Sequence, residues 1–60
     1  MKYYYLKHKE DLVYTIIIHY KPLNEKEKEI ELNLTLSELM KITDFLDWDG
    51  FEFKGDLYES

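Results

Sequence analysis

The side chains that most often do chemistry are scarce in this chain, and their spacing supports no catalytic or metal site. There are two histidines, His8 and His19, and no cysteine. Ser37 is the only serine before the C-terminal residue, and its place ahead of an apolar helical pattern is typical of a helix N-cap. No glycine-rich phosphate loop is present, and a metal site would need carboxylates in no recognisable pattern. We therefore expect a protein that is not an enzyme and uses no cofactor.

Carboxylates are the chemical groups that this chain has in excess. Thirteen acidic and eight basic residues among 60 give a formal charge of −5, which argues against direct nucleic-acid binding. The charge is uneven, because residues 1–28 sum to +2 and residues 29–60 to −7. Fixed carboxylates on a folded surface can replace phosphates in front of a basic cleft. Equally, an acidic surface can serve only to keep a small protein soluble.

Two apolar side chains lie among these acids. Met40 and Trp48 fall beside the carboxylates of an expected helix, and Met40 falls outside its apolar stripe. An exposed methionine and tryptophan ringed by charge suit an apolar contact at a protein interface. Alternatively, Trp48 covers the end of the core and Met40 packs on a neighbouring strand.

The elements that would position these side chains follow from hydrophobic periodicity. Residues 12–20 are rich in β-branched and aromatic side chains and predict a strand. After a charged connector over residues 21–28, residues 29–36 alternate between polar and apolar and predict its antiparallel partner. Residues 2–7 predict an extra edge strand, although three consecutive tyrosines give no clear period. Residues 51–54 alternate again and predict a short last strand.

One helix is expected between the last two strands. Ser37 is its predicted N-cap, and Glu38 lies in the first turn, where the helix dipole favours an anion. The helix should end near residues 47–49, ahead of a turn at Gly50. Its apolar stripe comprises Leu39, Ile42, Phe45 and Leu46.

These elements predict one small α+β domain over residues 1–60, a small antiparallel sheet with one helix packed on it. The expected order is ββαβ, or βββαβ where the N-terminal segment adds a strand. The helix should cover the sheet face that holds Leu12, Tyr14, Ile16, Ile18 and Tyr20. The other face, with Val13, Ile17 and His19, needs separate cover, either from a second copy of the chain or from the N-terminal tyrosines. No signal peptide or membrane span is apparent, so a cytoplasmic protein is expected.

Residues 29–39 resemble a known family. The segment Leu34-Thr35-Leu36-Ser37-Glu38 is close to the Leu-Ser-Leu-Ser-Asp entry into the helix of the small uracil-DNA glycosylase inhibitors of short-tailed Bacillus phages. Those proteins are acidic, of similar length and of ββαβ order, and the resemblance covers roughly residues 12–54. It implies a homodimer in the host cytoplasm that imitates DNA and blocks the DNA cleft of host uracil-DNA glycosylase.

The resemblance also implies a partner-binding surface, with some departures from the family pattern. Glu29 matches a glutamate of the second family strand, whereas Leu39 falls where the family has an aromatic residue. Met40 replaces an acidic residue and Thr43 a tyrosine. Phosphates would be replaced by Glu29, Glu38, Asp44 and Asp47, and the apolar contact would be lined by Leu39, Met40 and Thr43.

Two other functions remain open from the sequence. An acidic inhibitor of another host defence nuclease, such as a restriction or CRISPR enzyme, demands the same acidic surface. A small non-catalytic interaction module requires no acidic binding surface, because its acidic residues only keep the fold solvated.

Overall fold

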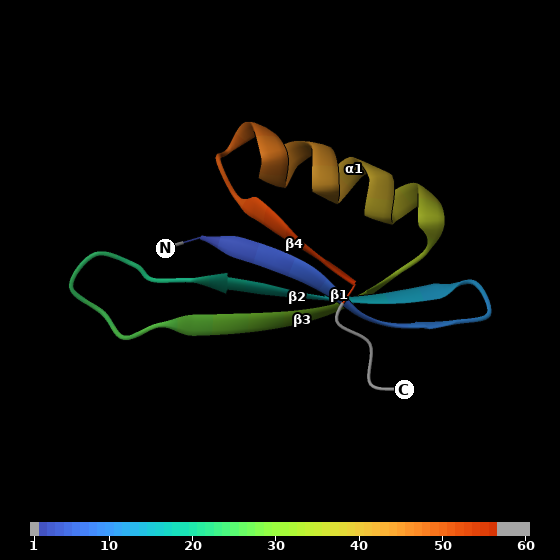
Figure 1. The fold of residues 1–60 in the computed structure, drawn as a ribbon, viewed down its shortest axis with the longest axis horizontal. Helices are drawn as coiled ribbons and strands as arrows, with labels where there is room; N and C mark the ends of the chain where they lie inside the picture. Colours follow the sequence, from blue (N-terminus) through green and yellow to red (C-terminus); the bar gives the residue numbers. More distant parts are fainter. Residues whose placement is uncertain (1, 57–60) are drawn as a thin grey trace.

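The computed structural model describes residues 2–56, which form four strands and one helix in the order β-β-β-α-β (Figure 1). The strands build one mixed sheet in the order β3-β2-β1-β4, and the helix packs on one face of it. The predicted small α+β fold is therefore confirmed, and the additional N-terminal strand is present. The sheet was predicted to be antiparallel but is mixed, because β4 runs parallel to β1. The elements are β1 (Tyr3–Glu10), β2 (Val13–Tyr20), β3 (Lys28–Leu34), α1 (Leu36–Trp48) and β4 (Glu52–Asp56).

The position of β1 corrects the sequence prediction, which made it an edge strand. β1 pairs antiparallel with β2 on one side and parallel with β4 on the other. The reason is the connection from β3 through α1 to β4, which passes over β2 and β1 and sets β4 beside β1. The predicted antiparallel pairing of β2 with β3 is confirmed and runs without a break from Tyr14 opposite Leu34 to Tyr20 opposite Lys28.

The turn between β1 and β2 is tight, since Glu10 pairs directly with Val13. Asp11 has a φ of 52°, in the left-handed region that aspartate tolerates better than most residues. Leu12 lies in this turn and is exposed, so the prediction that it shares the covered face of β2 was wrong.

The helix begins two residues earlier than predicted. Its N-cap is Thr35, whose hydroxyl accepts a hydrogen bond from the Glu38 backbone N–H while the Glu38 carboxylate accepts one from the Thr35 backbone N–H. Ser37, the predicted N-cap, lies inside the first turn. This reciprocal pair is the capping box, which needs a threonine or serine three residues before a glutamate. At the other end, Asp49 is the C-cap and Gly50 takes a φ of 92°, so the predicted end is confirmed.

The core lies between α1 and the sheet. Its buried side chains are Tyr4, Ile16, Ile18 and Leu46, against which Leu39 and Ile42 also pack. The predicted stripe therefore holds for three of its four residues. Phe45 is exposed, because it precedes Leu46 and points about 100° away from it around the helix.

The face of the sheet opposite α1 carries its own buried residues. Ile17 is only 3% exposed although no helix of the described residues covers it. Tyr5 lies opposite Ile17 on β1, and Tyr3 stacks on His19 with ring centroids 4.8 Å apart. Of the two covers considered from the sequence, the N-terminal tyrosines are the one seen within the chain.

Candidate protein-binding surface

The structure divides the predicted site residues between two faces of the sheet. Most of them lie on α1, whereas Glu29 lies on β3 with its side chain on the face that α1 does not cover. The odd-numbered residues of β3 share that face, while Leu32 and Leu34 pack toward the core under α1. Glu29 and the helical residues therefore belong to different surfaces.

A strip of exposed side chains runs along α1 on the side away from the sheet. It consists of Met40, Asp44, Asp47 and Trp48, which fall within about 100° of one another around the helix. Met40 is 61% exposed and Trp48 is 86% exposed. We call these four residues the α1 outer strip.

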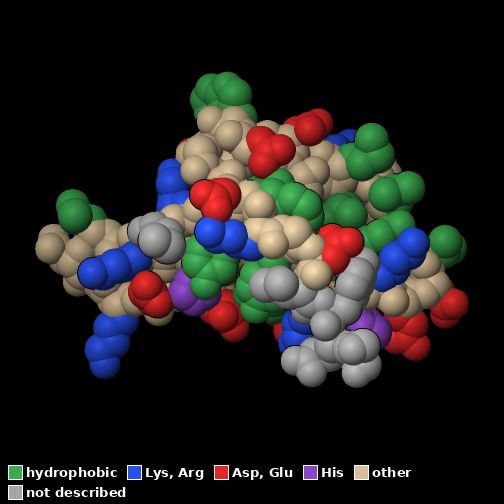
Figure 2. All heavy atoms as spheres, viewed as in Figure 1, with side chains coloured by type: hydrophobic (Ala, Val, Ile, Leu, Met, Phe, Trp, Pro, Cys, Tyr) green, Lys and Arg blue, Asp and Glu red, His purple; other side chains and the backbone are tan. Residues whose placement is uncertain are grey.

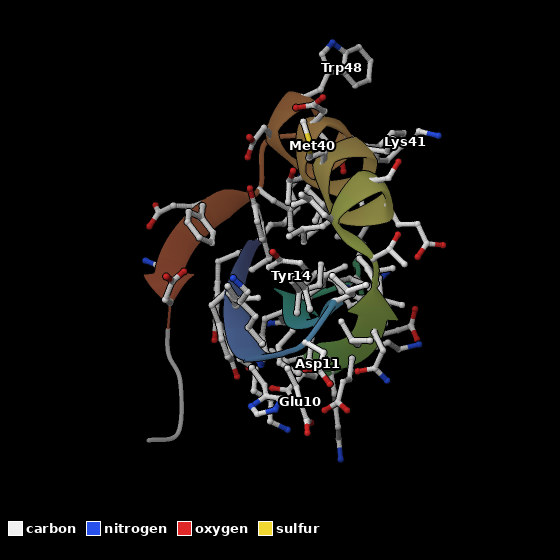
Figure 3. All side chains as sticks on the ribbon, turned by 90° about the vertical axis from the view of Figure 1, so that its right-hand side faces the viewer. Glu10, Asp11, Tyr14, Met40, Lys41 and Trp48 are labelled. Carbon is white, nitrogen blue, oxygen red and sulfur yellow. The ribbon has the colours of Figure 1, made fainter. Side chains whose placement is uncertain are left out.

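Figures 2 and 3 show the side of α1 that faces away from the sheet. In Figure 3, Trp48 projects from the end of α1 away from the sheet, and Met40 and Lys41 point in different directions from the helix. In the space-filling view, both hydrophobic and acidic side chains reach the surface over the part of the molecule that α1 forms (Figure 2). Trp48 therefore does not cover the end of the core, and Met40 is not packed under a neighbouring strand, which removes the two alternative roles considered from the sequence.

Asp47 is fixed in place by a contact with the sheet. The Tyr4 hydroxyl donates a hydrogen bond of 2.7 Å to the Asp47 carboxylate, which joins β1 to α1. Burial of the phenol, followed by this hydrogen bond, raises the pKa of Tyr4 to about 12. The carboxylate of Asp47 is thus held at the surface in one orientation, while Asp44 is free to reach toward solvent.

Three other predicted residues have structural contacts of their own. Glu38 is engaged in the capping box, and the hydrogen bonds from Thr35 lower the pKa of its carboxyl. It also lies about 120° around the helix from Asp44 and is outside the strip. Leu39 packs against the core and is largely withdrawn from the surface. The Thr43 hydroxyl donates to the backbone carbonyl of Met40 at 3.1 Å, so it is partly satisfied by the helix itself.

The acidic second half of the chain is not gathered on one surface. Glu29 lies 3.6 Å from the His19 ring, and Glu31 is paired with Lys7 at 3.0 Å, both on the face opposite α1. At the far end of α1, the Asp49 carboxylate is 3.7 Å from Lys2. The −7 charge of residues 29–60 is therefore partly balanced by cations of the first half. Among the described residues, the three carboxylates of α1 form no ion pair: Glu38, Asp44 and Asp47.

Within residues 2–56, no group of three or more histidine and acidic side chains is arranged to hold a metal ion. An open hollow lies within the β2–β3 connection and is lined by Lys21–Lys28. The α1 outer strip is the surface with the clearest capacity for recognition. Trp48 was considered from the sequence for an apolar interface contact but was not included in the predicted partner-binding set. Its spacing of four from Asp44 and eight from Met40 places it on that side of the helix.

Comparison of the chain with known proteins identified no similar protein. No family model, curated protein or solved structure matches this chain. Among the described residues, the single helix is too short and too polar to cross a membrane.

Proposed function

We propose that this chain is a non-catalytic inhibitor that binds the basic DNA-binding cleft of a partner enzyme through the α1 outer strip. The observation that carries the proposal is the exposure of Met40 and Trp48 beside the carboxylates of Asp44 and Asp47. Large apolar side chains grouped on a surface are typical of interaction sites, and tryptophan is enriched among residues that dominate binding energy. Flanking carboxylates favour a cationic partner and speed its encounter.

Uracil-DNA glycosylase is the enzyme that the family resemblance suggests. Its substrate is DNA, so an acidic strip on a rigid helix would compete with phosphates for the same cationic groups. The resemblance also suggests a homodimer, which light scattering of the purified protein would test independently of inhibition.

The test is a uracil-excision assay with an excess of purified protein. We expect inhibition at low salt that weakens as salt is added, since long-range attraction between exposed charges is screened. Trp48→Ala should weaken inhibition by about tenfold or more, because it removes the largest apolar contact. Asp44→Asn with Asp47→Asn should weaken it and reduce the salt dependence.

A matched control is available in the β2–β3 connection. Glu25→Gln with Glu27→Gln removes the same charge from a segment outside α1 and should leave inhibition nearly unchanged. Equal loss in both double variants would mean that net charge matters and the α1 outer strip does not. Uninhibited excision at low salt would exclude this glycosylase as the target.

Inhibition of another host nuclease is the alternative within the same mode of binding. A pull-down from bacterial lysate with the wild-type protein and with Trp48→Ala would identify a partner that depends on the strip. A plain interaction module predicts a partner whose affinity and salt dependence do not change when Asp44 and Asp47 become asparagine.

A further inference from the structure

The two edges of the sheet differ in how well they are protected. β4 is an edge of five residues, and its pairing with β1 shifts register at a bulge where Gly55 takes a φ of 90°. β3 is an edge of seven residues that pairs with β2 without any shift and contains no proline. Bulges and prolines are common devices that prevent an edge from accepting another strand. β3 lacks both.

The side chains of β3 are mainly acidic on one face of the sheet and mainly aliphatic on the other. Glu29 and Glu31 are exposed on the face opposite α1. On the α1 side, Ile30 is 40% exposed and Leu32 is half-buried. An added strand would therefore meet carboxylates on one side and aliphatic groups on the other, at alternate positions.

We propose that the β3 edge binds an extended segment of a partner protein as a fifth strand, and that this segment alternates basic and apolar side chains. Backbone hydrogen bonds to β3 would supply affinity, and the alternating side chains would supply specificity. Lysine or arginine would face Glu29 and Glu31, while apolar residues would extend the patch of Ile30 and Leu32. The site is separate from the α1 outer strip and does not depend on the proposed inhibition.

Charge complementarity favours a different chain over a second copy. The Lys7 ammonium contacts one oxygen of Glu31, and the His19 ring lies near one oxygen of Glu29, so each carboxylate keeps a second oxygen for a cation. Another copy of β3 would bring further carboxylates to this edge, and like charges placed opposite each other destabilise strand pairing.

The probe is a capped peptide of eight residues that alternates lysine and valine, added to isotope-labelled protein. We expect amide shift changes and slowed amide hydrogen exchange confined to β3. Glu29→Gln with Glu31→Gln should weaken binding about three- to tenfold, the effect of losing two cross-strand charge pairs. Both side chains are exposed, and the amide spectrum verifies that the variant is folded.

Three controls make the test specific to strand addition. A peptide alternating glutamate and valine should not bind, and neither should a lysine–valine peptide with methylated backbone nitrogens. Glu52→Gln with Asp56→Asn removes two charges from the β4 edge and should leave binding unchanged. Trp48→Ala should also leave it unchanged, which separates this site from the proposed inhibition.

Several outcomes would overturn the proposal. They are changes that map to β4 or α1, equal binding of the glutamate peptide, and unaltered affinity in the double glutamine variant. A solution mass that rises with concentration, with the amides of β3 protected in the absence of peptide, would assign the edge to a second copy and would also overturn it.

Discussion

Ile16 and Ile17 are neighbours on β2 and point to opposite faces of the sheet, yet both are almost fully buried. Ile16 is 1% exposed and lies in the core beneath α1, together with Ile18 and Leu46. Ile17 is buried on the face that no described helix covers. The same residue type in the same strand is thus removed from water in two different ways.

The uncovered face is closed by side chains of the sheet itself. Ile17 lies between Tyr5 on β1 and Glu31 on β3 in the strand register. The Lys7 ammonium reaches from β1 across β2 to the Glu31 carboxylate, at 3.0 Å. Beside this pair, the Thr15 hydroxyl donates to the Asn33 side-chain oxygen at 2.7 Å.

The burial of Ile17 within a single chain removes the need for a second copy to cover this face. From the sequence, Val13, Ile17 and His19 called for a second layer over this face. In the structure Ile17 is buried within one chain, and His19 is half-buried under the Tyr3 ring. The homodimer therefore remains a proposal based on the family resemblance, and burial of this face no longer requires it.

The largest expected difference between the two faces comes from matched truncations. Ile16→Ala should lower the free energy of unfolding by about 3–4 kcal/mol, because the packed core cannot close the cavity. Ile17→Ala should cost about 1–2 kcal/mol, because the long side chains over it border water and can move into the space. Urea unfolding measures both.

Equal losses for the two alanine variants would show that the uncovered face is packed as rigidly as the core. If Ile16→Ala does not fold, Ile16→Val and Ile17→Val provide the same comparison at a smaller scale. A core of this size contributes only about 3–5 kcal/mol in total, so the loss expected for Ile16→Ala is large enough to prevent folding.

An intermediate effect is expected at the hydrogen bond that joins the covered face to α1. Tyr4→Phe should lower stability by about 1 kcal/mol at neutral pH, since the Asp47 carboxylate remains solvated when its donor is lost. The pKa of Tyr4 is raised to about 12 from its ordinary 10.0, so folding favours the protonated phenol. Its contribution is fully present below pH 10 and is lost as pH rises toward 12.

The measurement is stability against pH for the wild-type protein and Tyr4→Phe. The two curves should converge or cross as pH rises above 10. A constant gap between pH 8 and 12 would contradict the assignment of the raised pKa to this phenol.

The smallest effect is expected for the ion pair over the uncovered face. The hydrogen bond and the charge of Glu31 raise the pKa of Lys7, so the stabilisation is present below pH 10.5 and is lost at higher pH. A double-mutant cycle with Lys7→Met and Glu31→Gln should give a coupling smaller than the Tyr4 effect. The coupling should fall in high salt, because both groups are exposed.

A coupling as large as that of the Tyr4 hydrogen bond, or one insensitive to salt, would make the ion pair a principal support of the uncovered face. The burial of Ile17 would then depend on a specific polar network. The two faces would differ less in their contribution to stability than we propose.

Much of the fold follows from local patterns. Alternation over residues 29–36 and the dense apolar run of residues 12–20 predicted the antiparallel pair β2 and β3, because a pleated strand repeats every two residues. The stripe of Leu39, Ile42 and Leu46 predicted the face of α1 that is buried. The start of the helix was misjudged although its signal was present, since Thr35 and Glu38 have the spacing of a capping box.

The candidate site was less accessible from the sequence. The exposure of Met40 follows from its position outside the stripe. The separation of Glu29 from Asp44 and Asp47 does not, because it depends on which face of β3 meets α1. The loss of Glu38 to the cap and of Leu39 to the core likewise depends on contacts that a one-dimensional pattern does not contain.

The sequence by itself determined the strands, the short amphipathic helix and the excess of carboxylates, because these are properties of neighbouring residues. Only the tertiary structure decided that β1 lies inside the sheet and β3 at its edge, since strand order depends on where the connection through α1 returns the chain. The same connection divided the acidic residues between two faces. It left Trp48 exposed at the end of the helix and Glu29 at the open edge of the sheet.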